Sequence, residues 1–279
     1  MIKNKSVTKM TLLVLNFILT MFLFNSQKVL GYGFGFSRND NHTTPNIGFY
    51  KEILDGTDSY YVKETQNKEL YLTFDAGYDN GVLSKILDVL NEKNVKATFF
   101  VTGDFLIREE ELAKRIALEG HIVGNHTWTH KNITKLSFLE LKSEIEKVEN
   151  AYQNLTGKTM MKFFRPPEGE FDRKSLENVQ KLGYSTFFWS IAYRDWDTKG
   201  QKGGDYGYNQ IMRQLHSGAI LLLHTVSEDN LEALPRVIDD ARSQGYVFKN
   251  LDEFKKDETN QDFILFLLHK KNYCDILYI

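Results

Sequence analysis

The sequence predicts an α/β protein whose parallel sheet curls into a (β/α) barrel. Two observations predict this class: apolar runs alternate about six times with amphipathic helical patterns, and polar residues of catalytic type follow the apolar runs. Short runs that are apolar throughout are typical of parallel strands covered on both faces. No internal repeat or linker interrupts the alternation, so a single α/β domain is expected.

The expected elements follow one another along this domain. Strands are predicted over residues 69–74, 96–101, 121–124, 162–165, 185–190 and 219–224. Apolar residues recur at helical spacing in six further segments, which cover residues 82–90, 105–118, 137–155, 174–182, 208–215 and 231–242. Ser137 followed by Glu140 predicts a capping box at the start of the third helix.

Composition excludes several other classes of protein. The 279 residues are 42% hydrophobic and 26% charged, which excludes a disordered chain, a collagen-like repeat and a multi-span membrane protein. The formal net charge of −2 argues against sequence-independent binding of nucleic acid. A single cysteine, Cys274, excludes an intramolecular disulfide and a cysteine-based zinc site.

The first 31 residues have the pattern of a secretory signal peptide. Three lysines precede the uncharged run 10–24, and the segment ends at Val29, Leu30 and Gly31. A retained membrane anchor is the alternative, although a span needs about 20 apolar residues and this run is shorter. We expect export, with no stable membrane insertion after cleavage.

The rest of the chain divides into three parts. Residues 32–67 are rich in Gly, Asn, Thr and Asp without a sustained period, and we interpret them as an irregular lead-in that packs over the domain. The α/β domain covers residues 68–256, and the charged stretch KKDETN marks its end. Residues 257–279 form a C-terminal extension to which we assign no function.

Two histidines stand four residues apart directly after a predicted strand. If residues 126–130 turn helical, His126 and His130 share one face and can hold one divalent metal ion. The alternative is a pair of hydrogen-bonding histidines with no ligand. The position of the pair at a strand end, beside other polar segments, favours the metal.

Three further residues of catalytic type lie at strand ends. Asp75 follows an apolar strand and can act as a general base, with a turn or helix-capping role as the alternative. Arg165 precedes Pro166 and Pro167, which stiffen the loop, and it can pair with a carboxylate of the site. A salt bridge on the surface is the alternative. His224 ends an apolar run, where a hydrogen-bonded core histidine is the ordinary outcome.

Five ordered segments resemble the motifs of the polysaccharide deacetylases, the NodB-homology or carbohydrate esterase family 4 enzymes. They are TFDAG, NHTWTH, FRPPEG, WSIAYRDW and LLLHT, and the resemblance covers residues 70–254. The lead-in YGFGF, the variant D-x-G-Y-x-N-G at residues 75–81 and the segment at Trp189 resemble the delta-lactam-biosynthetic de-N-acetylases. Those enzymes act on N-acetylmuramic acid in the peptidoglycan of the spore cortex, so the resemblance implies export to the cell wall or the spore intermembrane space.

The resemblance implies a deformed (β/α) barrel and metal-dependent hydrolysis of an N-acetyl group. It also implies an oxyanion site at a backbone N–H near Glu168, a sugar contact at Trp196, and a monomer that binds a peptidoglycan glycan strand. The expected cofactor is a divalent metal ion, with zinc preferred. Six positions match the family's functional residues: the general base Asp75, its orienting residue Arg165, the general acid His224, the carboxylate Asp195 that tunes it, and the metal ligands His126 and His130.

One position departs from the family pattern. The first motif usually reads T-F-D-D-G, and its second Asp is the third metal ligand, whereas this chain has Ala76 there. Relatives that deacetylate muramic acid also vary at this position, so the departure agrees with the subgroup. Two histidines hold an ion more weakly than three ligands unless Asp75 or Asp79 moves in, so a weakly held ion is predicted.

Two alternatives remain open. The same residues can deacetylate N-acetylglucosamine, chitin oligomers or an O-acetylated glycan, because the fold alone does not choose a substrate. A catalytically dead glycan-binding protein would explain Ala76, with Trp128, Trp189 and Trp196 as platforms on which sugars stack. The acid and base residues speak against the dead protein, since binding alone does not need them.

Overall fold

A computed structural model describes residues 31–38 and 40–256 of the chain. Every element described below belongs to the unit of the chain that begins at Tyr32. The predicted signal peptide, except Gly31, and the predicted extension 257–279 lie outside the described residues.

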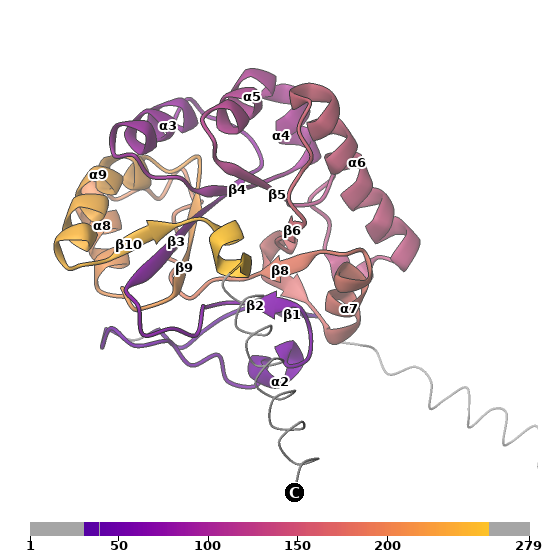
Figure 1. Ribbon diagram of the computed structural model, residues 1–279, viewed down its shortest axis with the longest axis horizontal. Coiled ribbons are helices and arrows are strands. Elements are labelled where there is room, and N and C mark those ends of the chain that lie inside the picture. Colours follow the sequence, from indigo (N-terminus) through magenta and orange to yellow (C-terminus); the bar gives the residue numbers. More distant parts are fainter. Residues whose placement is uncertain (1–30, 39, 257–279) are drawn as a thin grey trace, which may run out of the picture. The chain divides into compact units, whose positions relative to one another are not determined.

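The centre of the domain is a curled parallel sheet, with α3, α5, α6, α7, α8 and α9 arranged around it (Figure 1). Pairing runs in the order β9, β3, β4, β5, β6, β8, and every pair is parallel. These strands are β3 (Glu69–Ala76), β4 (Thr98–Val101), β5 (Ile122–Asn125), β6 (Phe163–Phe164), β8 (Ser185–Phe187) and β9 (Ala219–His224). Each overlaps a predicted strand, and the last matches its predicted range.

The sheet closes on itself beyond β8. Ile191 forms a single parallel bridge to Leu221, and the Ser190 amide donates to the carbonyl oxygen of Ile220 at 2.9 Å. Closure by one bridge rather than a full strand makes the barrel irregular, so the predicted deformed (β/α) barrel is confirmed. Two short strands of this sheet were not predicted: β10 (Val247–Lys249) pairs with β3, and β2 (Ser59–Tyr60) pairs with β8.

The helices follow the predicted order with one difference. They are α3 (Leu83–Glu92), α4 (Gly103–Arg108), α5 (Glu110–Leu118), α6 (Phe138–Thr156), α7 (Arg173–Lys181), α8 (Gly204–Met212) and α9 (Glu228–Ser243), with a last helical stretch at residues 251–256. The predicted helix 105–118 is two helices, because Glu109 between them leaves helical geometry at φ −119° and ψ 43°. The predicted capping box is present: the Glu140 amide donates to the Ser137 hydroxyl, and the Ser137 amide donates to the Glu140 carboxylate. No helix in the described ranges is long and apolar enough to cross a bilayer.

The lead-in packs against the domain through short elements. Strand β1 (Tyr32–Gly33) pairs antiparallel with β7 (Glu170–Phe171), and α2 (Tyr50–Leu54) follows it. Phe34 stacks on Phe188 with ring centroids 4.5 Å apart, and its amide donates to the Gly169 carbonyl oxygen at 2.9 Å. The lead-in therefore braces the loop that follows β6.

Side chains alternate across β3 and divide the core into two layers. Leu70, Leu72, Phe74 and Ala76 belong to the large apolar cluster that includes residues of the surrounding helices. Tyr71 belongs to an interior cluster with aromatic residues of β4, β6 and β8 and with Leu251 and Phe254, near the amino end of β3. Apolar packing therefore fills one end of the barrel, and the carboxyl ends of the strands carry the polar residues.

Candidate active site

The carboxyl ends of four strands bring the sequence-predicted residues together. Asp75 is the penultimate residue of β3 and His224 the last residue of β9, while His126 and Arg165 directly follow β5 and β6. These positions converge because parallel strands end at one edge of the sheet. In the register of β3 and β9, Asp75 and His224 are direct neighbours.

Asp75 and Arg165 form a buried ion pair. Arg165 Nη1 lies 2.8 Å from Asp75 Oδ1, and the Arg165 side chain is 0% exposed. Arg165 Nε donates to the Phe187 carbonyl oxygen at 3.0 Å, Nη2 donates to that of Phe188 at 3.3 Å, and the guanidinium lies 4.2 Å from the Phe100 ring centroid. The guanidinium is therefore fixed on three sides and holds one carboxylate oxygen in a set position.

The surroundings of Asp75 decide its charge. Burial by itself would raise the pKa of the Asp75 carboxyl. The positive charge of Arg165, with smaller contributions from His126 and His224, outweighs burial and holds this pKa below its ordinary value of 3.8. Asp75 is therefore a carboxylate at neutral pH, in the form that can accept a proton.

His126 is buried beside this pair in its neutral form. Its Nδ1 donates to the Arg165 carbonyl oxygen at 2.8 Å, and its Nε2 lies 3.5 Å from Asp75 Oδ2. Burial lowers the pKa of His126 to about 4. With Nδ1 carrying the proton, the lone pair of Nε2 points into the site, which is the form in which imidazole binds a metal.

Residues 126–130 are not helical, so the condition attached to the predicted histidine pair was wrong. Thr127 and His130 instead adopt positive φ angles of 66° and 55°, which turn the chain back on itself. The rings of His126 and His130 still meet edge to face, with centroids 4.9 Å apart. His130 is exposed whereas His126 is buried, so the pair presents one fixed and one accessible imidazole.

The site offers two protein donors to a metal ion. Among residues 31–38 and 40–256, no group of three or more His, Cys, Asp or Glu side chains is arranged to hold one. Ala76 is fully buried in the apolar cluster, and Asp79 accepts hydrogen bonds from the amides of Gly81 and Leu83 at the start of α3. Imidazole nitrogens such as those of His126 and His130 are donors of the kind that a divalent ion such as zinc takes in an open, weakly binding site.

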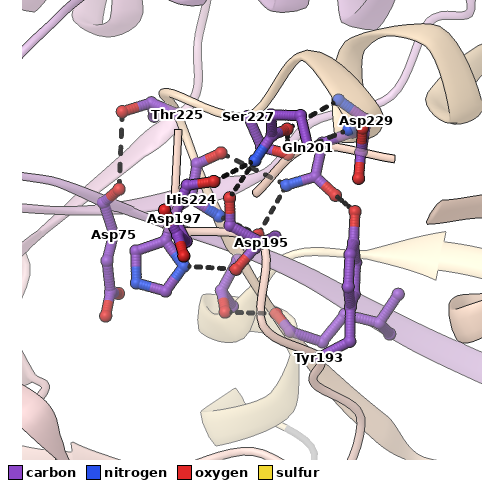
Figure 2. A network of polar contacts seen from close by, with 12 residues as sticks. Asp75, Tyr193, Asp195, Asp197, Gln201, His224, Thr225, Ser227 and Asp229 are labelled. Atoms are coloured by element: carbon purple, nitrogen blue, oxygen red, sulfur yellow. Dashed lines mark hydrogen bonds and ion pairs between the residues drawn. The ribbon is translucent and has the colours of Figure 1, made fainter. Parts of the chain in front are cut away.

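His224 is paired with Asp195, and its ring lies between Asp75 and Asp195 in Figure 2. His224 Nδ1 donates to Asp195 Oδ1 at 2.7 Å, and the His224 amide donates to Asp195 Oδ2 at 2.7 Å. Burial alone would lower the pKa of His224, but the charge of Asp195 raises it above the ordinary value of 6.5. The imidazole therefore retains a second proton at higher pH than a free histidine does.

A polar network behind Asp195 was missed from the sequence. Asn230 Nδ2 donates to Asp195 Oδ2 at 2.6 Å, and the Tyr193 hydroxyl donates to Asn230 Oδ1 at 2.5 Å. Gln201 Nε2 donates to the Asp195 carbonyl oxygen at 2.9 Å, as Figure 2 shows. Tyr193 lies in the segment WSIAYRDW, so the motif could have identified it. Asn230 lies in α9, where no motif in the sequence points to it.

Glu168 and Trp196 lie at exposed positions near these groups in sequence. Glu168 sits in the 3₁₀ turn Pro167–Gly169, two residues after Pro166, and has a left-handed backbone with φ 57°. Trp196 is 53% exposed, and the Arg194 guanidinium lies 4.8 Å from its ring centroid. Neither side chain contacts Asp75 or His224 through a hydrogen bond in the described part of the chain.

The other two tryptophans are packed into the protein. Trp189 contacts Phe34 edge to face at 5.4 Å, and Trp128 packs against the large apolar cluster. Trp128 lies so close to Gly103 that a Cβ atom there would meet the indole ring at 2.2 Å. Of the three proposed sugar platforms, Trp196 is thus the one with more than half of its surface free.

The amino-acid sequence is similar to that of known deacetylases. The chain matches the polysaccharide deacetylase family over residues 62–187. It is 43% identical over 220 residues to the peptidoglycan-N-acetylmuramic acid deacetylase PdaA of Bacillus subtilis, a match that covers 78% of this chain and 84% of that protein. It is 35% identical over 193 residues to the peptidoglycan-N-acetylglucosamine deacetylase PgdA of Listeria monocytogenes, covering 68% of this chain and 40% of that protein.

The fold is also similar to that of a solved deacetylase structure. The solved structure of Bacillus subtilis PdaA, a family 4 carbohydrate esterase, superposes with a TM-score of 0.79 at 41% identity. The superposition covers 82% of this chain and 98% of that structure. Sequence and fold therefore point to one group of proteins over most of the described domain.

Proposed function

The chain belongs to the polysaccharide deacetylase family, and on that premise we propose that it hydrolyses the N-acetyl group of N-acetylmuramic acid in peptidoglycan. It is a polysaccharide N-deacetylase of the carbohydrate esterase family 4 type. The reaction rests on one observation above all: an ionised carboxylate, Asp75, and an imidazole of raised pKa, His224, are neighbours on β3 and β9. The 43% identity to PdaA supports the choice of sugar.

Asp75 acts as the general base in this proposal. Its carboxylate is ionised at neutral pH and takes a proton from the water that attacks the acetyl carbonyl. Arg165 positions it, because the 2.8 Å bond to Oδ1 leaves Oδ2 to face the site. The carboxylate therefore needs no rearrangement before the proton is transferred.

His224 acts as the general acid. The bond from Nδ1 to Asp195 leaves Nε2 to carry the proton that passes to the leaving amine. Asp195 raises the pKa of the imidazole above its ordinary value of 6.5, which favours the protonated form that the general acid needs. An amine is a poor leaving group until it is protonated, so this transfer allows the carbon–nitrogen bond to break.

His126 and His130 would hold the divalent ion that the family generally uses, and zinc is our expectation. When bound, such an ion polarises the acetyl carbonyl and lowers the pKa of water. The bond from His126 Nδ1 to the Arg165 carbonyl oxygen fixes the tautomer that leaves Nε2 free.

The substrate is positioned at the rim of the site. We assign the backbone around Glu168 to the developing oxyanion, because this turn follows Arg165 closely and its left-handed residue redirects the amides. We assign Trp196 to the sugar, because its exposed ring offers an apolar face. The chain is expected to act on one glycan strand as a monomer.

The biological setting follows from the product. Deacetylation leaves a free amine near the lactyl carboxyl of the same muramic acid, so ring closure to muramic delta-lactam can follow. We place this step in the spore cortex. Export through residues 1–31, with cleavage or as a retained anchor, would bring the enzyme to peptidoglycan outside the cytoplasmic membrane.

A second substrate has a specific observation in its favour. The 35% identity to PgdA supports N-acetylglucosamine, although this chain covers only 40% of that protein. The same Asp75 and His224 would serve either sugar.

The proposal is tested with the full chain and purified peptidoglycan. The wild type should release acetate, whereas D75N should lose release by about 10²- to 10⁴-fold, the usual contribution of a general base, and still cosediment with the glycan. If both forms bind alike and neither releases acetate, the chain is a glycan-binding protein and the proposal is wrong.

A further inference from the structure

Helix α6 carries a buried carboxylate on the side that faces the histidine loop. Glu144 lies in the middle of this helix and is 7% exposed. Burying a carboxylate is unfavourable unless hydrogen bonds replace its water. Across the described ranges, no Lys, Arg or His side chain forms an ion pair with Glu144, so its partners must be sought among hydrogen-bond donors.

Both oxygens of Glu144 bind the same residue of the loop. Oε2 accepts the Thr129 amide at 2.7 Å, and Oε1 accepts the Thr129 hydroxyl at 2.9 Å. Thr129 directly precedes His130. The buried carboxylate of Glu144 therefore binds the residue next to the exposed His130 imidazole.

A second contact joins the other end of the loop to the same helix. Asn125 Oδ1 accepts the Thr127 amide at 3.0 Å, and Asn125 Nδ2 donates to the Ile145 carbonyl oxygen at 3.0 Å. Glu144 and Ile145 are adjacent in α6. The loop from His126 to His130 is thus held at both ends by two consecutive residues of one helix.

The loop needs this support because its backbone is strained. Thr127 and His130 both have positive φ, a conformation that costs about 1–3 kcal/mol for a residue other than glycine. His126 is buried and fixed by its bond to Arg165, whereas His130 is exposed. The position of the His130 ring beside His126 depends on the backbone that carries it.

We propose that Glu144 is a positioning residue that sets the spacing of His126 and His130 and so the affinity of the site for a divalent ion. This inference rests on the proposed function, since it takes these two imidazoles as the metal donors. With Ala76 in place of a third ligand, the correct placement of His130 carries more of the binding than it would in a complete triad.

The test compares zinc affinity by equilibrium dialysis of the full chain. In E144Q the side chain is neutral, so its hydrogen bonds to the Thr129 amide and hydroxyl lose the strength that the carboxylate charge gives them, and the loop is held less firmly. Zinc affinity should fall about 10- to 100-fold, the usual cost of losing an outer partner of a metal ligand. E146Q is the matched control on the same helix, because Glu146 is exposed and its one ion pair among the described residues is with Lys142 at 3.6 Å. Its zinc affinity should equal that of the wild type.

Two variants of Thr129 separate positioning from charge. T129V keeps the Glu144 charge and removes one hydrogen bond, so its zinc affinity should fall by less than that of E144Q. T129S retains the hydroxyl and should bind zinc as the wild type does. A loss in E144Q with T129V unchanged would mean that the charge acts at a distance and would overturn the positioning role.

The remaining outcomes are distinct. Equal zinc affinity in E144Q and the wild type, both folded by circular dichroism, overturns the inference and leaves the proposed function standing. Should the wild type bind zinc no better than an H126A/H130A double variant, the metal part of the proposed function is wrong, and this inference is wrong with it. If E144Q does not fold, T129V against T129S decides the question.

Discussion

Asp75 and His130 lie in the same candidate site, yet the protein holds them in different ways. Asp75 is fixed within β3 and paired with Arg165, which itself binds two backbone carbonyl oxygens and packs on Phe100. His130 is exposed on a loop with two positive φ angles, and hydrogen bonds from α6 hold that loop. One half of the site is locked into the barrel and the other half is attached to its surface.

This difference separates two kinds of function within one site. The acid–base half must keep its geometry and charges, so Asp75, Arg165 and Asp195 are buried with several partners each. The histidine half has Ala76 where the family pattern has a metal ligand, and its His130 side chain is exposed to solvent. We therefore expect mutations in the first half to affect stability and activity together, and changes in the second half to affect activity alone.

The largest effect should come from breaking the buried ion pair. R165M leaves Asp75 buried without its cation, so the free energy of unfolding should fall by about 3–5 kcal/mol, and acetate release should fall with it. Urea unfolding at pH 7 measures the loss. The control R108M removes an exposed partner of Asp104 and should change stability by less than about 1 kcal/mol.

The same pair gives stability a defined pH dependence. Because folding lowers the pKa of Asp75 below 3.8, its contribution is present above that pH and is lost as pH falls through the lower folded value. R165M should not show this loss in acid. Equal unfolding free energies for R165M and the wild type would mean that the acid–base half is not locked by Arg165.

Removing the metal tests the histidine half. Dialysis against a chelator should lower acetate release strongly, and adding zinc should restore it, since two imidazoles hold an ion weakly. The unfolding temperature should hardly change, because an open site with two protein donors closes no part of the fold. Full activity in protein that elemental analysis shows to be metal-free would contradict this account.

A smaller effect is expected from the partner of the general acid. D195N removes the charge that raises the pKa of His224, so that pKa should fall and the alkaline limb of the pH–rate profile should move to lower pH. In the wild type this limb should lie above pH 6.5. D197N is the control, because Asp197 accepts from Lys199 and Arg194 rather than from His224. A limb that stays in place in D195N would remove Asp195 from this role.

The smallest effect concerns the rim. W196A should raise the KM for peptidoglycan a few-fold and leave kcat unchanged, because the ring contacts substrate equally before and during the reaction. Steady-state kinetics on soluble muropeptides measures both constants. A fall in kcat with unchanged KM would place Trp196 in the chemical step instead.

The sequence predicted the barrel well because its strands are apolar and locally distinct. Residues 219–224 were predicted with their true bounds, since an apolar run ends at a histidine. Strand β10 was missed because Val247–Lys249 is short and half-exposed, and its pairing with β3 joins residues far apart in the chain. Pairing of β1 with β7 also depends on such distant contacts.

The structure brings the predicted residues together, but the groups that support them were not predicted. Asp75, His126, Arg165 and His224 stand out because polar residues at the ends of apolar strands are conspicuous. The shape of residues 126–130 could not be predicted, since Asn125 and Glu144 impose it through contacts across the fold. Asn230 could not be predicted either, because it meets Asp195 only once α9 has packed.

The central claim is that this acid–base pair removes acetyl groups from muramic acid. The most direct measurement is mass spectrometry of peptidoglycan fragments before and after treatment with the full chain, with fragmentation that assigns each lost acetyl group to a sugar. N-acetylmuramic acid should lose its acetyl group, and N-acetylglucosamine should keep its own. Loss from N-acetylglucosamine alone, or from neither sugar, would contradict this claim.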